Sequence, residues 1–275
     1  MKKLTAEAVE RYRTDGFHAP IRAISAEEAA TLRRQLEAHE AQHGVLKGPL
    51  RHKSHLLFTW LDRLIRHPGI LDAVEDILGP NLLVWGSSFF TKEAHDPGFV
   101  SWHQDSTYWG LDPADIVTAW VALSDSTAEN GAMRVIPGSH KLDQIAHRDT
   151  FAAGNLLSRG QEIAVEVDEA QARMLVLQPG EMSLHHVRLI HGSDPNPSGR
   201  RRIGFAIRYL PTYVRQVVGS HDSATLVRGV DDFRHFEPEQ RPDADFSEAA
   251  RAFHAQVTGA HQQILMRDTG RTAAA

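Results

Sequence analysis

Residues 99–109 read FVSWHQDSTYW, a short run in which large aromatic residues flank a histidine and an aspartate. Similar runs recur through the middle of the chain, rich in β-branched and aromatic residues and separated by Gly, Pro, Asn and Asp. This pattern is typical of an antiparallel β-sandwich or barrel. The other runs are NLLVWGSSFFTK (81–92), IVTAWVALS (116–124), GAMRVIPG (131–138), ARMLVLQPGEMSLHH (172–186), VRLIHGS (187–193) and RRIGFAIRYLP (201–211).

Helical patterns flank this β region on both sides. Thr5 starts a helix that ends near Gly16, and Ser25 with Glu28 forms a capping box ahead of a longer helix. Residues 55–80 read as two short helices separated at Pro68-Gly69 and stopped at Gly79-Pro80. A further helix follows the cap residue Ser247 and runs towards residue 266. We therefore predict a mainly β protein with flanking α-helices.

We expect the 275 residues to form one domain with no internal repeat or linker. The polar segment 141–172 is interpreted as an insertion that covers a site, and 267–275 as a loose tail. The predicted parts are a helical N-terminal part at about 1–80, a β core at about 81–211 and a C-terminal extension at about 212–275.

Composition excludes several classes of function. The net charge of −5 argues against a general nucleic-acid or anionic-membrane surface. The absence of cysteine excludes disulfides, thiolate catalysis, iron–sulfur clusters and cysteine-bound zinc. The chain shows neither a secretory signal nor an apolar run long enough to span a membrane. We expect a cytoplasmic protein whose partner is a small molecule, while the oligomeric state cannot be read from the sequence.

The histidine and aspartate of the opening stretch are candidates for a metal site. Residues two apart in a strand share a face, so His103 and Asp105 point the same way. With one more histidine they would form the two-histidine, one-carboxylate set that holds Fe(II) with open positions. Chance alone gives about two H-x-[DE] pairs in a chain with 17 histidines and 35 acidic residues. Two further pairs lack an apolar strand context and are interpreted as incidental: His147/Asp149 and His235/Glu237. A buried His–Asp hydrogen bond remains the structural alternative.

His191 is the candidate for the third ligand. It ends an apolar run and precedes a turn, and Arg202 follows it by eleven residues. If the metal chelates one end of 2-oxoglutarate, an arginine fork beyond the turn can hold the far carboxylate. His185 and His186 compete for the ligand position, and Arg200 and Arg201 compete for the role of the arginine.

These motifs together resemble the phytanoyl-CoA dioxygenase family of Fe(II)/2-oxoglutarate oxygenases. The resemblance covers roughly residues 8–211 and rests on WHQD (102–105), IPGSH (136–140) and PGE…LIHGSDPNPSGRRRIGFAIRY (179–209). It implies a double-stranded β-helix, or jelly-roll, cupin-like core with N-terminal helices. It also implies hydroxylation of an unactivated C–H bond of a small metabolite or natural-product intermediate, using Fe(II), 2-oxoglutarate and O₂ and releasing succinate and CO₂.

The resemblance also implies roles for individual residues. The implied iron ligands, and therefore the catalytic residues, are His103, Asp105 and His191. The implied co-substrate residues are Arg202 as the clamp, with Ser193, Trp120 and Lys92 beside it. Halogenating relatives have a small residue in place of the carboxylate, so Asp105 favours hydroxylation or another oxidation over halogenation.

Other readings remain open at this point. Two histidines and a carboxylate also suit zinc, which would make the protein a cupin-like hydrolase or isomerase without a use for Arg202. A non-catalytic jelly-roll binding protein would only bury His103 and Asp105. The loop residues Arg51, Lys53 and His55 suit either an anionic group of a substrate or a solvated basic loop. Four more residues are interpreted as turn or core residues rather than as site residues: His140, Trp102, Tyr108 and Trp109.

Overall fold

Three of the helices begin at the capping residues that the sequence indicates, Thr5, Ser25 and Ser247, whereas Pro68-Gly69, expected between two helices, forms the start of the fourth helix. The computed structural model describes residues 1–152, 154–157, 159–219 and 221–267. The backbone N–H of Ala8 donates to Thr5 Oγ1, and Ser25 and Glu28 form the predicted capping box, with bonds of 2.7 and 3.1 Å. The helices are α1 (Ala6–Asp15), α2 (Ala26–His43), α3 (Thr59–Ile65), α4 (Pro68–Leu78) and α5 (Glu248–Leu265).

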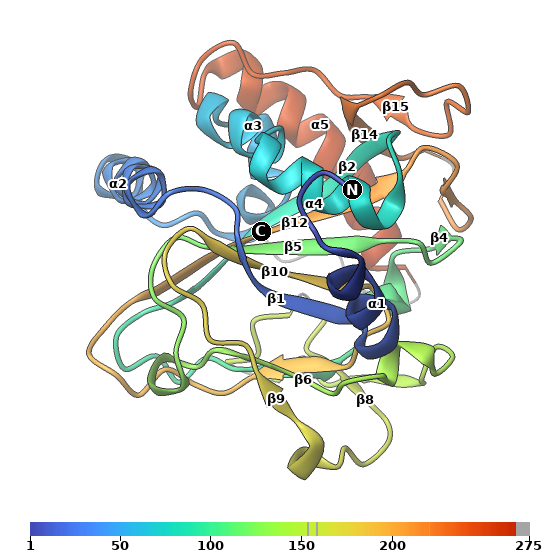
Figure 1. The fold of residues 1–275 in the computed structure, drawn as a ribbon. Coiled ribbons are helices and arrows are strands. Elements are labelled where there is room, and N and C mark those ends of the chain that lie inside the picture. The colour runs from blue at the N-terminus through green and yellow to red at the C-terminus, as the bar shows by residue number, and fades with distance from the viewer. Residues whose placement is uncertain (153, 158, 220, 268–275) are drawn as a thin grey trace.

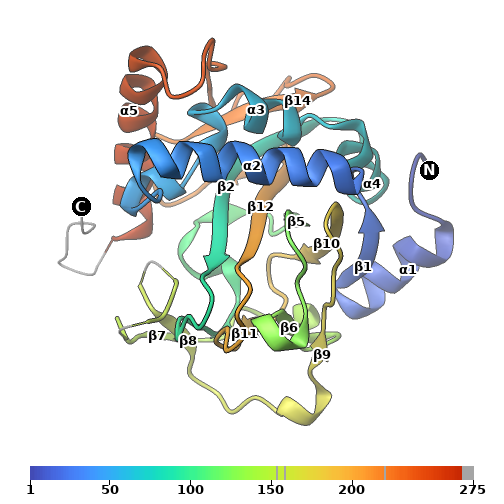
Figure 2. The ribbon, with the colours of Figure 1, turned by 90° about the vertical axis from the view of Figure 1, so that its left-hand side faces the viewer.

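A seven-stranded sheet spans the molecule, with α2, α3 and α4 over one of its faces and α1 at one edge (Figures 1 and 2). Its strands pair antiparallel except for the last two, which are parallel. In spatial order they are β1 (Phe17–Arg22), β10 (Glu181–His186), β5 (Val117–Ala122), β12 (Arg202–Pro211), β2 (Leu82–Lys92), β14 (Ser223–Arg228) and β15 (Glu237–Pro238).

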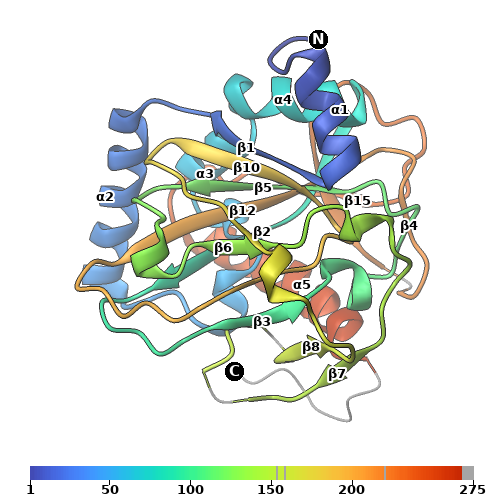
Figure 3. The ribbon, with the colours of Figure 1, turned by 60° about the horizontal axis from the view of Figure 1, so that its bottom comes forward.

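A smaller antiparallel sheet faces the open side of the large one (Figure 3). The two sheets and the helices make the mainly β jelly-roll with flanking helices that the sequence predicts. The strands of the small sheet are, in spatial order, β3 (Val100–His103), β11 (His191–Ser193), β6 (Met133–Val135) and β9 (Arg173–Met174). Two short pairs complete the strands: β4 (Leu111–Asp112) with β13 (Arg215–Gln216), and β7 (His147–Asp149) with β8 (Gln161–Ile163). Single turns of 3₁₀-helix occur at η1 (Gly48–Arg51), η2 (Ser54–Leu56), η3 (Asp105–Tyr108), η4 (Ala128–Asn130), η5 (Ser139–Lys141) and η6 (Glu169–Gln171).

Alternation along β12 divides the molecule into a core and a site. Ile203, Phe205, Ile207 and Tyr209 face the helices and join the main hydrophobic cluster. The residues between them face the small sheet, because side chains alternate along a strand. Two of those inward residues are arginines at the two ends of the row, Arg202 and Arg208, with Gly204 and Ala206 between them.

The large sheet extends beyond the predicted β core of about 81–211. It takes β1 from the N-terminal part, which we expected to be helical, and β14 and β15 from the C-terminal extension. β1 was missed because it is short, carries Pro20 and lies at the sheet edge, where proline is tolerated. The single-domain organisation stays a prediction. Of the tail expected over 267–275, only Arg267 lies within the described residues. No helix in this described part is long and apolar enough to cross a lipid bilayer.

Candidate functional site

The His103–Asp105 pair lies where β3 gives way to a turn. β3 ends at His103, Gln104 is still extended, and Asp105 begins η3, so the strand is shorter than the predicted 99–105. The two side chains nevertheless meet, with His103 Nε2 3.4 Å from Asp105 Oδ1. The side chain of Gln104 is bonded elsewhere, donating to the carbonyl of Arg188 at 3.0 Å and accepting from Ile145 N at 2.8 Å.

The neighbouring strand brings His191 to this pair. His191 on β11 lies directly opposite His103 on β3, and the two rings are 4.1 Å apart. One ligand atom each from His103, Asp105 and His191 fall within 4.8 Å of one another. The competing residue His185 lies close, with its ring 5.0 Å from that of His191, but outside this cluster. His186 packs instead against His140, away from the cluster.

Hydrogen bonds prepare both imidazoles to bind a metal. Nδ1 of His103 lies 2.9 Å from the Ser101 carbonyl, and Nδ1 of His191 lies 2.9 Å from the Leu189 carbonyl. A carbonyl can only accept, so each Nδ1 carries the proton and each Nε2 presents a lone pair towards Asp105. The donor set is therefore two neutral nitrogens and one carboxylate.

Charges around the cluster favour this protonation state. Burial and the neighbouring His103 hold the pKa of His191 well below its usual range. Burial alone would raise the pKa of Asp105, but its close contact with His103 and the nearby His191 and Arg208 hold it well below its usual range. The cluster thus offers a carboxylate and free imidazole lone pairs at neutral pH, as an octahedral divalent metal with open positions requires.

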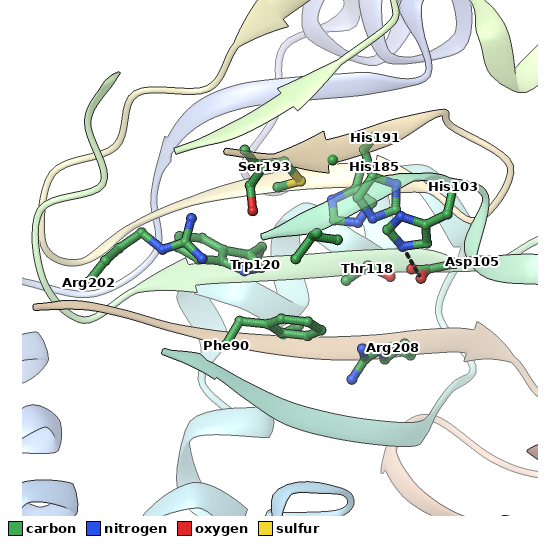
Figure 4. Close-up of a pocket in the computed structure, with 14 residues that line it drawn as sticks. Phe90, His103, Asp105, Thr118, Trp120, His185, His191, Ser193, Arg202 and Arg208 are labelled. Carbon is green, nitrogen blue, oxygen red and sulfur yellow. Dashed lines mark ion pairs between the residues drawn. The ribbon is translucent and has the colours of Figure 1, made fainter. Parts of the chain in front are cut away.

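The cluster opens into a small cavity of about 40 Å³ between the two sheets (Figure 4). Four polar atoms in its wall are buried without a hydrogen-bond partner among the described residues: Thr118 Oγ1, His185 Nδ1, Arg202 Nε and Arg208 Nε. Buried polar groups in proteins are nearly always satisfied. Such a concentration in one wall fits a polar ligand that supplies the partners.

Arg202 lines one end of the cavity, and a second buried basic residue, Lys92, lies beside it. Lys92 on β2 is directly opposite Arg202 on β12. Lys92 Nζ donates to Ser193 Oγ at 2.8 Å and to the Asp194 carbonyl, and Arg202 donates to the Gly131 carbonyl. Burial and Arg202 lower the pKa of Lys92 to about 7, and burial lowers the pKa of Arg202 to about 10. This end of the cavity is thus suited to a carboxylate.

The structure brings the predicted site residues together. Trp120 on β5 lies between the metal cluster and Arg202 in Figure 4, and the Arg202 guanidinium is 5.5 Å from its ring. The competing arginines point elsewhere: Arg200 is exposed and pairs with Glu129, and Arg201 pairs with Glu40.

The residues set aside in the sequence lie outside the cluster. His147 accepts from the Gln104 backbone at 2.9 Å, and His235 and Glu237 are exposed. Among the aromatics, Tyr108 and Trp109 line a second cavity next to the metal cluster, whereas Trp102 stacks under Arg134 away from it.

Several wall residues of the metal cavity escaped the sequence reasoning, among them Phe90, Thr118 and Arg208. A signal existed for Arg208, because it shares the strand face of Arg202 at an even spacing and is a charge within an apolar run. Phe90 and Thr118 are ordinary strand residues in the sequence, and only the pairing of the sheets places them in the wall.

The chain matches the family model of the phytanoyl-CoA dioxygenases over residues 2–204. Two solved structures cover nearly all of both chains. The non-heme monooxygenase ThoJ in its apo form is 40% identical, covers 94% of this chain and 97% of its own, and has a TM-score of 0.83. CytC3 with Fe(II) and alpha-ketoglutarate is 26% identical, covers 90% and 98%, and has a TM-score of 0.66.

Curated relatives match over shorter stretches. The probable alpha-ketoglutarate-dependent hypophosphite dioxygenase of Stutzerimonas stutzeri is 34% identical over 56% of this chain and 54% of its own length. The L-proline trans-4-hydroxylase of Streptomyces griseoviridis is 27% identical over 74% of this chain and 85% of its own. The chain thus spans about half the length of the first relative and most of the second.

Proposed function

The chain belongs to the phytanoyl-CoA dioxygenase family, and we propose that it is an Fe(II)- and 2-oxoglutarate-dependent dioxygenase. It hydroxylates an unactivated C–H bond of a small metabolite or natural-product intermediate and releases succinate and CO₂. The observation that carries the proposal is the cluster of His103, Asp105 and His191, whose ligand atoms lie within 4.8 Å of one another.

The three residues of the cluster are the proposed iron ligands. The carbonyls of Ser101 and Leu189 hold the imidazoles in the tautomer that a metal needs. When bound, iron with 2-oxoglutarate and O₂ supplies the oxidising power for the C–H bond, which no amino-acid side chain can supply. The chain's own task is to orient both organic molecules and to exclude water.

Arg202 and Lys92 are the proposed partners of the far carboxylate of 2-oxoglutarate. Both are buried and lie opposite one another on β2 and β12, and Arg202 lies at the end of the cavity away from Asp105 (Figure 4). A guanidinium fork binds a carboxylate through two parallel hydrogen bonds, and the ammonium group of Lys92, itself bonded to Ser193 and Asp194, adds positive charge beside it. Ser193 Oγ accepts a hydrogen bond from Lys92 and so holds it in place. Trp120 forms an apolar wall that keeps water away from the contact between Arg202 and the carboxylate.

The zinc hydrolase alternative gives these cations no task. It would leave Arg202 and Lys92 buried next to each other without an anion, which is costly. A non-catalytic protein would likewise leave the four unpartnered polar atoms of the cavity without a ligand. The oxygenase accounts for both observations, because a co-substrate and a substrate together fill the site.

The test is formation of succinate from 2-oxoglutarate by metal-free protein reconstituted with Fe(II) in air. We expect succinate only when Fe(II), 2-oxoglutarate and O₂ are all present, and none with Zn(II). Arg202→Met raises the KM for 2-oxoglutarate by about 30-fold or more, since it leaves a buried carboxylate with one partner fewer. Arg200→Met, an exposed arginine two residues away, leaves the KM unchanged. Succinate formation with Zn(II) instead of Fe(II), or an unaltered KM in Arg202→Met, contradicts the proposal.

A further inference from the structure

A second and larger cavity of about 290 Å³ adjoins the metal cluster on the side away from Arg202. It shares Phe90, Asp105 and Arg208 with the first cavity. Its other walls come from η1, β2, α5 and residues 155–157 of the polar segment 141–172. A molecule in this cavity therefore reaches the metal cluster without passing the co-substrate end.

Arg208 lies at the junction of the two cavities. Its side chain donates to Ser88 Oγ at 2.9 Å and lies 5.8 Å from the Phe90 ring and 5.7 Å from the Trp109 ring. Its Nε is buried without a hydrogen-bond partner, and within the described ranges the guanidinium forms no ion pair with a carboxylate. A half-buried guanidinium with a buried, unpartnered Nε is costly unless a ligand supplies the anion.

Arg51, at the end of η1, is a second cation in the wall of the same cavity. Its guanidinium makes a 3.5 Å contact with the Phe89 carbonyl, and no described acidic side chain pairs with it. His52 beside it stays neutral, because burial and the positive groups of His261, Arg208 and others lower its pKa to about 3. The cavity wall therefore holds two guanidinium groups without an ion pair among the described residues; Asp105 acts on Arg208 from a greater distance and belongs to the metal cluster.

The next two basic residues of the same loop behave differently. Lys53 Nζ lies 2.5 Å from Glu239 Oε1, and His55 Nε2 lies 3.3 Å from Glu239 Oε2, all three side chains being buried. The chain thus provides a carboxylate for Lys53 and His55 but not for Arg51 and Arg208. Lys53 also lines the cavity, but Glu239 compensates its charge, whereas Arg51 and Arg208 line the cavity without an ion pair among the described residues.

We propose that the substrate carries a small oxyanion, a carboxylate or a phosphonate, which binds to Arg208 and Arg51 in this second cavity. The inference rests on the proposed function and names the substrate class of the same site. Both oxyanions fit a guanidinium fork. The two ends of the site are well separated, because six residues of strand place Arg202 and Arg208 about 20 Å apart. Figure 4 shows Arg208 below Asp105 and Arg202 at the far end of β12. The co-substrate and substrate anions therefore bind on separate arginines.

The experiment measures thermal stabilisation of the Fe(II)–2-oxoglutarate protein, kept anaerobic, by small compounds at equal ionic strength. Acetate and methylphosphonate are the anions, and acetamide is the neutral match of acetate. A ligand that binds only the folded state raises the melting temperature in proportion to its affinity. We expect acetate, methylphosphonate or both to raise the melting temperature, and acetamide to leave it unchanged. The anion that raises the melting temperature more is the preferred oxyanion.

Variants assign the binding to the two arginines. In Arg208→Met the affinity for the anion falls by about 30-fold or more. Arg208→Lys keeps the charge but not the fork, so its affinity lies between those of Arg208→Met and the unaltered protein. Met has a similar length and needs no anion, so this variant is not expected to unfold. Arg51→Met also lowers the affinity for the anion, whereas Arg200→Met leaves this affinity unchanged. The affinity for 2-oxoglutarate changes less than threefold in Arg51→Met and Arg200→Met, and in Arg208→Met it falls by far less than the affinity for the anion.

The outcomes separate the inference from the proposed function. If 2-oxoglutarate binds to the Fe(II) protein but acetamide stabilises it as much as the anions do, or if Arg208→Met binds the anions as well as the unaltered protein, the inference is overturned alone. An Arg208→Met protein that loses 2-oxoglutarate overturns it too, because Arg208 then belongs to the co-substrate. Failure of the unaltered protein to bind Fe(II) and 2-oxoglutarate refutes the proposed function itself.

Discussion

Lys92 makes the binding of 2-oxoglutarate depend on pH. Burial and the neighbouring Arg202 lower its pKa to about 7, so half of the Lys92 side chains are neutral at that pH in the free protein. The far carboxylate of 2-oxoglutarate, bound beside Lys92, favours the charged form and raises this pKa. The bound state therefore holds more protons than the free state above pH 7, and affinity falls as the pH rises through 7.

The size of the effect follows from the free-state pKa. Well above pH 7 each pH unit weakens binding by about tenfold, until the pH reaches the pKa of the bound state. Between pH 6.5 and 8.5 the dissociation constant of 2-oxoglutarate should rise by about 25-fold. Below pH 7 the curve flattens, because Lys92 is then already charged. The carboxylates of 2-oxoglutarate are ionised throughout this range.

The assay is an anaerobic titration of the Fe(II) protein with 2-oxoglutarate at several pH values, followed by the visible absorption of the chelate. In Lys92→Met the dissociation constant is raised at pH 6.5 and no longer varies with pH. Lys141→Met, an exposed lysine, keeps the full dependence. A dissociation constant that is flat from pH 6.5 to 8.5, or an equal slope in Lys92→Met, refutes the reasoning.

Two further predictions concern packing and stability. Glu239→Gln lowers the free energy of unfolding in urea by about 3 kcal/mol or more at pH 7, because it leaves Lys53 and His55 buried without a carboxylate; unchanged stability would contradict this. Burial would raise the pKa of Glu239, but Lys53 and His55 hold it well below its usual range. Its contribution is therefore present above the unfolded pKa of about 4.3 and is lost as the pH falls, so the acid-induced loss of stability should be smaller in Glu239→Gln. Gly204→Ala places a Cβ 1.9 Å from Trp120 Cζ2, so the ring must move off Arg202. We expect a cost of about 1–3 kcal/mol in unfolding and weaker 2-oxoglutarate binding; a variant that binds as tightly as the unaltered protein would show that Trp120 has no part in the site.

Features that depend on neighbouring residues could be predicted from the sequence. Ser25 and Glu28 cap a helix through bonds three residues apart, and spacing two apart was enough to bring His103 and Asp105 together. The arginine eleven residues after His191 was identified by resemblance, and its strand and turn do place it in the cavity. In each case the residues that determine the feature lie within a dozen positions of one another.

Features that depend on distant pairing could not be predicted. The Lys53–Glu239 pair joins residues 186 apart in sequence, and the sequence around either residue does not indicate its partner. The loop containing Arg51, Lys53 and His55 was left between an anion site and a solvated surface. The structure divides it, with Lys53 and His55 bound to Glu239 and Arg51 in a cavity wall. Likewise, β1 joins β10 at the sheet edge although its residues follow a helix.

The most direct test of the central claim is an anaerobic titration of the metal-free protein with Fe(II) and then 2-oxoglutarate, in the unaltered chain and in histidine and aspartate variants. The account predicts one iron per chain and a weak visible charge-transfer band when 2-oxoglutarate is added. The band should be lost in His103→Ala, Asp105→Ala and His191→Ala and kept in His140→Ala. A band that survives the loss of any of these three ligands, or no band in the unaltered protein despite tight metal binding, would contradict the account.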